Sequence, residues 1–384
     1  MDKSIVSENL RRLRKHRKLS QTAVAEGAGI SLSTYRNIEK ELSTPRVDTL
    51  MSIADILEID LKQILAPVNK LSAVRFRAKK QMNSRSQILA DVGSWLRDFN
   101  QLEEILANKV EFKLERFISS LPPTTEMIAA AIECRSFLGL KPDEPIQDIC
   151  GLLESVGVKV YTYNLASHDF FGLSVAANDG GPAIVINTFD RIPVERWIFS
   201  AAHELAHLLF HLDSFDVEQS DENQVQEKEA DVFASHFLMP QDAFQKKWQE
   251  SAGLNSMDRV LKVKRYFKVS YKTVLYRLNE LFVREQNIYQ WFNTEYKQRT
   301  GKSLADHREP DSQHPKVFSA SMAESLRSKE PENLSNIEFI ESRLDRLVRL
   351  AIEKEEISLG RGAEILERSL EEMRELANSW NAYA

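Results

Sequence analysis

The fold of the middle of this chain is decided by two short stretches, His203-Glu204-Leu205-Ala206-His207 and Glu227-Lys228-Glu229-Ala230-Asp231. Histidines four positions apart lie on one face of a helix, so both imidazoles can bind one metal ion. Glu204 beside them can act as a general base, and Glu227 can be the third protein ligand. Asp231, one turn later, is placed to accept the free N–H of a ligating imidazole. The pattern predicts a Zn²⁺ site, with Mn²⁺ as the alternative.

Other interpretations of these histidines exist. The plain alternative is an amphipathic helix from Trp197 to Leu212 whose histidines only face water. His211 extends the row, but it lies a full turn, ~5–6 Å along the axis, beyond His207. Its spacing also differs from the HExxHxxGxxH pattern. We interpret His211 as a helix-end residue or as a partner of a ligand, and His236, in an apolar run, as a packed residue.

Residues 196–207 and 227–240 resemble the ImmA/IrrE family of zinc metallopeptidases. They read Arg-Trp-Ile-Phe-Ser-Ala-Ala-His-Glu-Leu-Ala-His and Glu-Lys-Glu-Ala-Asp-Val-Phe-Ala-Ser-His-Phe-Leu-Met-Pro, with the Leu-Met-Pro signature at the end. The resemblance covers about 125–285 and implies a thermolysin-like zincin core in which a short sheet precedes the HExxH helix. It implies metal ligands at His203, His207 and Glu227, with Glu204 as general base. Asp231 stands where this family often carries Asn.

The composition is that of an ordinary globular protein, with 384 residues, 42% of them hydrophobic and 28% charged. This length allows two or three domains. No apolar run reaches the ~20 residues that cross a bilayer, and no signal-peptide pattern is present, so we expect a cytoplasmic protein without a membrane partner. Cys134 and Cys150 lack CxxC spacing and should stay reduced. The net charge of −6 hides a basic N-terminal end, which suggests an anionic partner.

Residues 4–66 predict about five short helices, two of them joined by a tight turn that contains glycine, as in a helix-turn-helix. The alternative is a small helical bundle that binds no nucleic acid. Four segments resemble the Xre or lambda-repressor type of helix-turn-helix: Leu19-Ser-Gln-Thr-Ala-Val-Ala, Gly29-Ile-Ser, Tyr35-Arg-Asn-Ile-Glu39 and Thr44-Pro-Arg-Val-Asp-Thr-Leu. One departure is Lys40-Glu41, where that family usually has a glycine after the glutamate.

This second resemblance implies that the second helix of the motif enters the major groove of a double-stranded operator. Arg36 would bind a guanine and Asn37 an adenine by bidentate hydrogen bonds. The side chains expected at base edges are Leu32, Ser33, Arg36 and Asn37. The side chains expected at phosphates are Gln21, Arg12 and Lys18. Such domains bind inverted half-sites as dimers, so we expect a homodimer.

Between the two motifs, residues 67–120 are expected to be helical. The basic run within 61–90 either supports DNA binding or is a solvated helix face. Three strands at 158–163, 172–176 and 183–186, with a hairpin turn at 178–181, predict a small antiparallel sheet before the zinc helix. The edge of such a sheet can accept an extended substrate, and Phe170 to Val175 is the expected edge.

We therefore expect a mainly α protein with a small antiparallel sheet, an α+β fold. Five regions are expected: a five-helix lambda-repressor-like DNA-binding domain (1–67), a helical linker (68–122), a metallopeptidase domain (123–285), a polar linker (286–335) and a C-terminal helical region for a partner or dimer (336–384).

Three functions remain open. In the first, a transcriptional regulator uses its zinc peptidase domain to cleave a repressor or the product of a neighbouring gene. In the second, the peptidase-like domain senses metal, peptide or a partner without cleavage. In the third, the chain is an antitoxin or a phage or stress regulator that represses its own operon. The complete set of ligands and base favours cleavage. The donor that would stabilise the oxyanion is not assigned, with Tyr271 and Tyr276 as the candidates.

Overall fold

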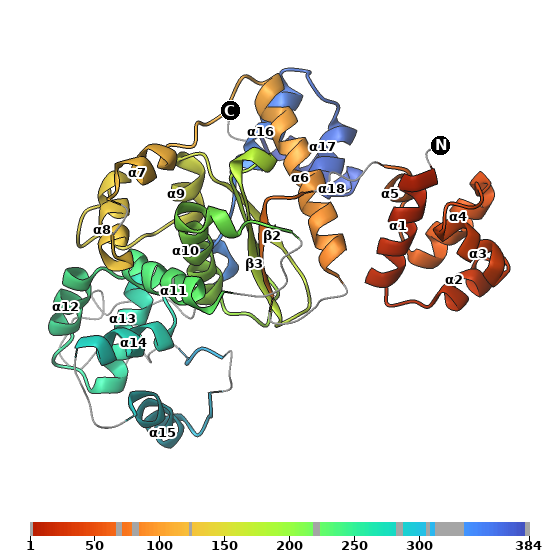
Figure 1. The fold of residues 1–384 in the computed structure, drawn as a ribbon. Coiled ribbons are helices and arrows are strands. Elements are labelled where there is room, and N and C mark those ends of the chain that lie inside the picture. The colour runs from red at the N-terminus through yellow and green to blue at the C-terminus, as the bar shows by residue number, and fades with distance from the viewer. Residues whose placement is uncertain are drawn as a thin grey trace. The chain divides into compact units, whose positions relative to one another are not determined.

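The computed structural model describes residues 3–66, 71–78, 84–122, 125–217, 223–281, 287–304, 308–311 and 334–380. The chain divides into two compact units. The first unit comprises residues 1–72, 79–107 and 351–384, and the second comprises residues 73–78 and 108–350. Figure 1 labels most of the elements of both units.

Five helices open the first unit, as expected for the lambda-repressor type. They are α1 (Lys3–His16), α2 (Gln21–Gly27), α3 (Leu32–Glu39), α4 (Val47–Leu57) and α5 (Leu61–Leu65). Ser20 and Ser31 cap α2 and α3, because their side chains accept hydrogen bonds from the N–H groups of Ala23 and Thr34. Gly29, with φ 67°, turns the chain between the two helices. The apolar faces of the helices close over buried side chains such as Leu10 and Tyr35.

The turn after α3 keeps a left-handed residue although it lacks a glycine. Glu41 has φ 64°, a conformation that costs a residue with a side chain roughly 1–2 kcal/mol. The chain therefore adopts at Glu41, without a glycine, a backbone conformation that glycine adopts at little cost.

The remainder of the first unit is helical. It contains α6 (Arg85–Ile105), α17 (Leu359–Ile365) and α18 (Leu370–Trp380). Arg361 of α17 donates to Asp98 Oδ1 of α6 at 2.8 Å, so α17 packs beside α6, and α18 packs against α17. The helical C-terminal region is thus confirmed.

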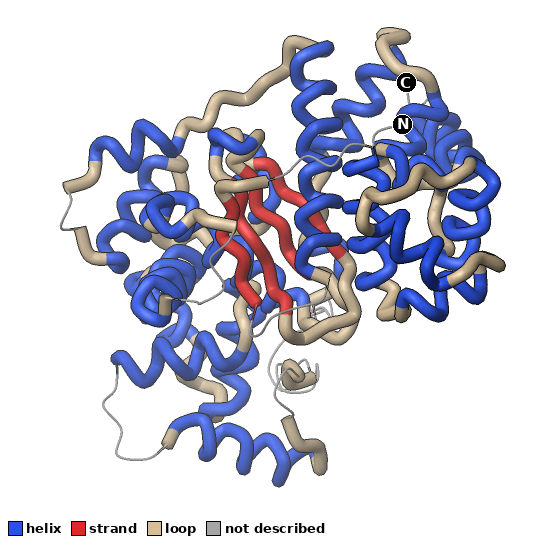
Figure 2. The backbone as a smooth tube through the Cα atoms, turned by 45° about the vertical axis from the view of Figure 1, so that its right-hand side comes forward, coloured by secondary structure: helices blue, strands red, loops and turns tan. Residues whose placement is uncertain are grey.

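The second unit contains a four-stranded sheet in the order β1-β3-β4-β2, and Figure 2 shows these strands side by side. The strands are β1 (Val74–Ala78), β2 (Lys159–Tyr163), β3 (Phe170–Val175) and β4 (Ala183–Asn187). β3 and β4 form the expected antiparallel hairpin, and β1 pairs antiparallel with β3. β2 and β4 are parallel, so the sheet is mixed and not wholly antiparallel.

Two further expectations about this sheet were wrong. Residues 74–78 form a strand within the stretch expected to be helical, because Val-Arg-Phe-Arg-Ala alternates apolar and basic residues with the period of a strand. β3 was expected at the edge, but it lies between β1 and β4. Among the described strands, β1 and β2 are the edges of the sheet.

Helices make up most of the rest of the second unit. They are α7 (Leu114–Ser120), α8 (Met127–Phe137), α9 (Ile149–Ser155), α10 (Val194–Phe210), α11 (Gln224–Leu238), α12 (Gln241–Glu250), α13 (Ser256–Phe267), α14 (Tyr271–Leu281), α15 (Ile288–Thr300) and most of α16 (Arg343–Glu353). Of these, α9 and α10 are the ones that pack closely on the strands. The core joins α10 and α11 to apolar residues of β4 such as Ile184 and Ile186. Of the expected polar linker, α15 is a helix whose Phe292 stacks on Tyr271, and residues 312–333 lie outside the described residues.

None of the helices in the described part of the chain combines the length and the apolar character needed to cross a membrane.

Candidate metal centre and DNA-binding helix

Helix α10 carries both histidines of the HExxH motif on its buried face. The helix packs against α11 and against strands β3 and β4. His203 and His207 are both fully buried. The four-residue spacing therefore places two imidazoles together away from bulk water, as the sequence pattern predicts.

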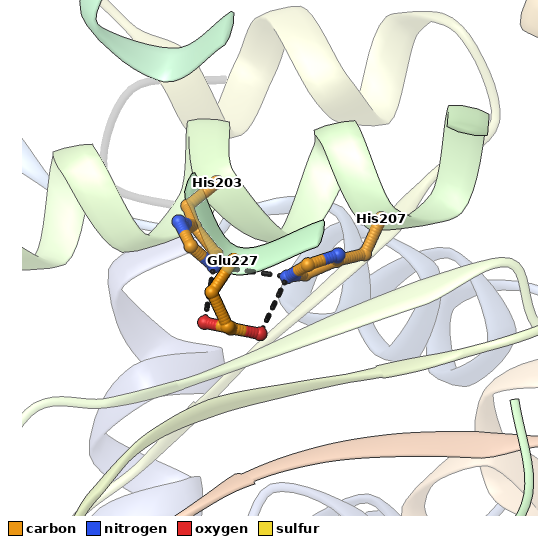
Figure 3. Close-up of side chains that lie close together, drawn as sticks. All are labelled: His203, His207 and Glu227. Carbon is orange, nitrogen blue, oxygen red and sulfur yellow. Dashed lines mark hydrogen bonds and ion pairs between the residues drawn. The ribbon is translucent and has the colours of Figure 1, made fainter. Parts of the chain in front are cut away.

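Glu227 of α11 completes a compact cluster with these histidines, drawn in Figure 3. The Nε2 atoms of His203 and His207 lie 2.9 Å apart. Glu227 Oε2 lies 3.2 Å from His203 Nε2, and Glu227 Oε1 lies 3.2 Å from His207 Nε2. Among the described residues, these three side chains form a group of metal-ligating type whose atoms lie within 4.8 Å of one another.

The partner of His203 determines which of its ring nitrogens carries the proton. His203 Nδ1 lies 2.8 Å from Asp231 Oδ1. A carboxylate only accepts hydrogen bonds, so Nδ1 is the donor in this contact, and a ring with its single proton on Nδ1 has a free lone pair on Nε2. The sequence placed Asp231 in this role, and the structure brings it to that position.

A chain of hydrogen bonds through His211 determines which ring nitrogen of His207 carries the proton. Glu229 Oε2 lies 2.9 Å from His211 Nε2, and His211 Nδ1 lies 2.8 Å from His207 Nδ1. If Glu229 accepts from His211 Nε2, then neutral His211 accepts from His207 Nδ1, and His207 Nε2 keeps its lone pair. Burial lowers the pKa of His207 to about 3 and also lowers the pKa of His211, so both rings are neutral near pH 7.

The donor set fits a metal ion. The lone pairs of two imidazole Nε2 atoms and the carboxylate of Glu227 converge. When both rings carry their proton on Nδ1, no hydrogen lies between these three acceptors, and they repel one another. A cation between them removes this repulsion, and two His and one Glu are a known ligand set for catalytic zinc. His211 lies on the far side of His207 from this cluster, which matches its interpretation as a partner of a ligand.

Glu204 is buried under strand β3. The hydroxyl of Ser174 donates to Glu204 Oε2, and a Cβ atom added to Gly172 would lie 3.3 Å from Glu204 Oε1. The same added atom would lie 2.8 Å from the backbone oxygen of Val185. Only glycine at position 172 therefore lets β3 pass this close to the carboxylate.

Arg75 is a residue of this site that the sequence analysis missed. It was counted with the basic run, but it is 9% exposed and lies on β1. Its guanidinium donates to Glu227 Oε1 at 3.0 Å and to Gln226 Oε1 at 2.6 Å. The alternation of residues 74–78 was the signal that could have placed it on a strand.

A cavity of about 230 Å³ lies beside Asp231, the residue that contacts His203 Nδ1. Asp231, Phe199 and Tyr276 are among its lining residues. Tyr276 thus lines the same cavity as Asp231, and burial raises the pKa of its hydroxyl to about 12. Tyr271, the other candidate donor, is buried against Phe292. His236 is buried as expected, with Nε2 at 3.5 Å from Glu280.

In the first unit, α3 presents the side chains expected at base edges. Ser33, Arg36 and Asn37 are exposed, and Leu32 is half-buried. Gln21 bridges Arg36 and Glu39, because its amide accepts from Arg36 Nε at 3.3 Å and donates to Glu39 Oε2 at 2.6 Å.

The remaining phosphate candidates differ in their surroundings. Lys18 is exposed, whereas Arg12 is half-buried and donates to Gln87 Oε1 at 2.6 Å and to Asn9 Oδ1 at 3.0 Å. The guanidinium of Arg12 is therefore hydrogen-bonded to other residues of the first unit, whereas the side chain of Lys18 is exposed.

Comparison with known proteins identifies two domains. A family model described as helix-turn-helix matches residues 10–64. The M78 peptidase family model, described as the IrrE N-terminal-like domain, matches residues 153–279. YqaE of Bacillus subtilis (strain 168), an uncharacterized HTH-type transcriptional regulator, is 31% identical over 110 residues, which are 29% of this chain and 90% of YqaE.

The fold, the exposed α3 and the match to residues 10–64 define a DNA-binding regulator of the helix-turn-helix class. The chain belongs to the HTH-type transcriptional regulators, and its second unit carries an IrrE-like domain of the M78 peptidase family. Both resemblances expected from the sequence are thereby confirmed.

Proposed function

We propose that this regulator is also a metal-dependent endopeptidase that cleaves a protein such as a repressor or the product of a neighbouring gene. The observation that carries the proposal is the convergence of His203 Nε2, His207 Nε2 and the Glu227 carboxylate in a buried cluster. The general base of the motif, Glu204, belongs to the same helix as both histidines.

His203, His207 and Glu227 would hold Zn²⁺, or Mn²⁺ as the alternative. When bound, such an ion polarises a peptide carbonyl and makes water acidic enough to lose a proton near neutral pH. Glu204 takes that proton as the water oxygen attacks the carbonyl carbon, and it returns the proton to the leaving nitrogen as the C–N bond breaks.

Neighbouring groups orient these residues. The hydroxyl of Ser174 donates to Glu204 Oε2 and limits the directions in which the carboxylate can turn. Asp231 and His211 contact the Nδ1 atoms of the two ligating rings and so keep the Nε2 lone pairs directed at the cluster.

The DNA-binding role rests on α3, which would enter the major groove with Arg36 and Asn37 at base edges. A homodimer on an inverted repeat would place two copies of α3 in successive major grooves. Gln21 would position Arg36 through the hydrogen bond between their side chains.

A second candidate is a regulator or antitoxin whose peptidase-like domain senses metal, peptide or a partner without cleavage. One observation favours it: the guanidinium of Arg75 donates to Glu227, so a positive charge already lies beside the cluster. A fixed cation there weakens the attraction of the cluster for a metal ion.

Intact-mass analysis separates the two candidates. The full chain is incubated with Zn²⁺ or Mn²⁺ and with the products of neighbouring genes, beside Glu204→Gln and the exposed control Glu133→Gln. We expect a metal-dependent cut by the parent and the control, and none by Glu204→Gln. Metal bound at one per chain without any cut would contradict proteolysis and favour the sensor.

A further inference from the structure

Strand β1 attaches a distant part of the chain to the strand that covers the general base. Val74 pairs with Val175, Arg75 with Ser174 and Phe76 with Leu173. Two further hydrogen bonds extend this pairing. Ala73 N donates to the side-chain Oδ2 of Asp179 at 3.0 Å, and Ala176 N donates to the backbone oxygen of Ala73 at 3.0 Å. In sequence, β1 follows the DNA-binding domain directly.

The side chain of Arg75 lies on the face of the sheet that carries Glu204. Directly opposed residues of an antiparallel pair have their side chains on the same face. Ser174 is the partner of Arg75, and its hydroxyl reaches Glu204 of α10. From that face, Arg75 reaches Glu227 and Gln226 of α11. An Arg side chain of β1 therefore extends to the carboxylate of the metal cluster.

We propose that β1 occupies the position in which the peptidase domain binds an extended peptide, and this rests on the proposed function. A peptide binds to a sheet by adding a strand to a free edge. β3 is the strand that touches Glu204, and β4 takes its other side. The side of β3 that a peptide would need is the side that β1 fills.

The residues of β1 indicate which class of peptide would bind at this side of β3. It is an extended segment with an arginine between two apolar residues, Val74 and Phe76. The arginine is bound by Glu227 and Gln226, and Phe76 stacks on Phe170 with ring centroids 5.2 Å apart. A substrate in trans must displace a tethered strand, whose effective concentration is on the order of millimolar.

Peptide binding tests this occupancy without any need for cleavage. The full chain carries Glu204→Gln, and β1 is replaced by Val74→Gly, Arg75→Ser, Phe76→Gly, Arg77→Ser and Ala78→Gly. The probe is a fluorescein-labelled peptide, Leu-Ser-Ala-Val-Arg-Phe-Arg-Ala, measured by anisotropy with Zn²⁺ present. A scrambled peptide of the same composition and charge is the control.

We expect the strand-replaced variant to bind the probe at least tenfold more tightly than the chain with Glu204→Gln alone. Ala in place of the first arginine of the probe should weaken binding about tenfold, because a charge-assisted hydrogen bond is lost. A folded variant that binds the probe no better than the scrambled peptide would overturn the proposal.

A second variant covers the case in which the replaced strand prevents folding. Val74→Cys with Val175→Cys joins register partners, so oxidation locks β1 onto β3. The native thiols should not interfere, because Cys134 and Cys150 are buried and burial raises their pKa values. Reduction should increase probe binding at least tenfold, and equal binding by oxidised and reduced chains would overturn the proposal.

The two proposals fail in different ways. If no substrate is ever cleaved but the probe binds where β1 has been removed, the peptidase function fails and the occupancy of β3 stands. If a substrate is cleaved but removal of β1 does not change probe binding, the peptidase function stands and the proposed occupancy of β3 fails.

Discussion

The Nδ1 atom of His207 lies 2.8 Å from Nδ1 of His211, so His211 contacts the ring nitrogen of His207 that points away from the proposed metal site. His211 ends α10 and is in turn bound by Glu229 of α11. The third histidine of the row thus acts through the second one, and the two helices share a hydrogen-bonded chain that ends at a proposed ligand.

Loss of this chain should weaken metal binding. His211→Ala leaves His207 Nδ1 without its partner, and partners of ligands typically contribute 10–100-fold in metal affinity. We expect Zn²⁺ affinity to fall by that range in competition with a chromophoric chelator. His168→Ala, a histidine outside the cluster, should leave the affinity unchanged. Unaltered affinity in His211→Ala would refute the relay.

Metal should stabilise the second unit. An ion that binds the folded state at 100 times its Kd adds about 2.7 kcal/mol, and a chelator removes this gain. We expect Zn²⁺ to raise the melting temperature by several degrees in calorimetry. His203→Ala should abolish the increase. A similar increase in that variant would place the metal elsewhere.

Gly172→Ala should disturb Glu204, the proposed general base. The new methyl group would lie 2.8 Å from the backbone oxygen of Val185 and 3.3 Å from Glu204 Oε1, so β3 must shift. Such overpacking costs about 1–3 kcal/mol, which urea unfolding can measure, and any cleavage should fall with it. Gly253→Ala is the matched control, because no atom lies within 4 Å of the added Cβ. Equal stability of the two variants would argue against the close approach of β3.

Glu154 should make stability fall with rising pH. Burial raises its pKa from 4.5 to about 7, so the folded state binds more protons than the unfolded state between these values. The free energy of unfolding therefore decreases as pH rises from about 4.5 through 7, by at most about 3 kcal/mol from this group. Glu154→Gln should flatten the slope in urea titrations across this window. An unchanged slope would show that other groups cause it.

Arg36 and Lys18 should affect DNA binding differently. Arg36→Ala should relax sequence preference at one base pair by about 1–3 kcal/mol, because a base-edge contact is lost. Lys18→Ala should weaken binding to all sequences alike and reduce the salt dependence by about one ion. Binding-site selection followed by salt titration measures both effects. An unchanged preference in Arg36→Ala would contradict the docking of α3.

Local patterns in the sequence sufficed for the elements that depend on neighbours along the chain. The spacing of His203 and His207 predicted one helical face, and the glycine-containing turn predicted the break between two short helices, where Gly29 lies between α2 and α3. Helical periodicity and capping act over a few residues, so they can be recognised in one stretch of sequence. The two family resemblances extended this to the domain level.

The contacts between distant segments were decided only by the tertiary structure. The basic residue Arg75 reaches Glu227 because β1 adds to β3, and the sheet is mixed because β2 pairs with β4 in the parallel direction. Strand pairing depends on which distant segments meet, and no local period encodes that choice. The sequence by itself therefore determined the HExxH motif and the helix-turn-helix, and the packing of β1 on β3 decided that Arg75 lies beside Glu227.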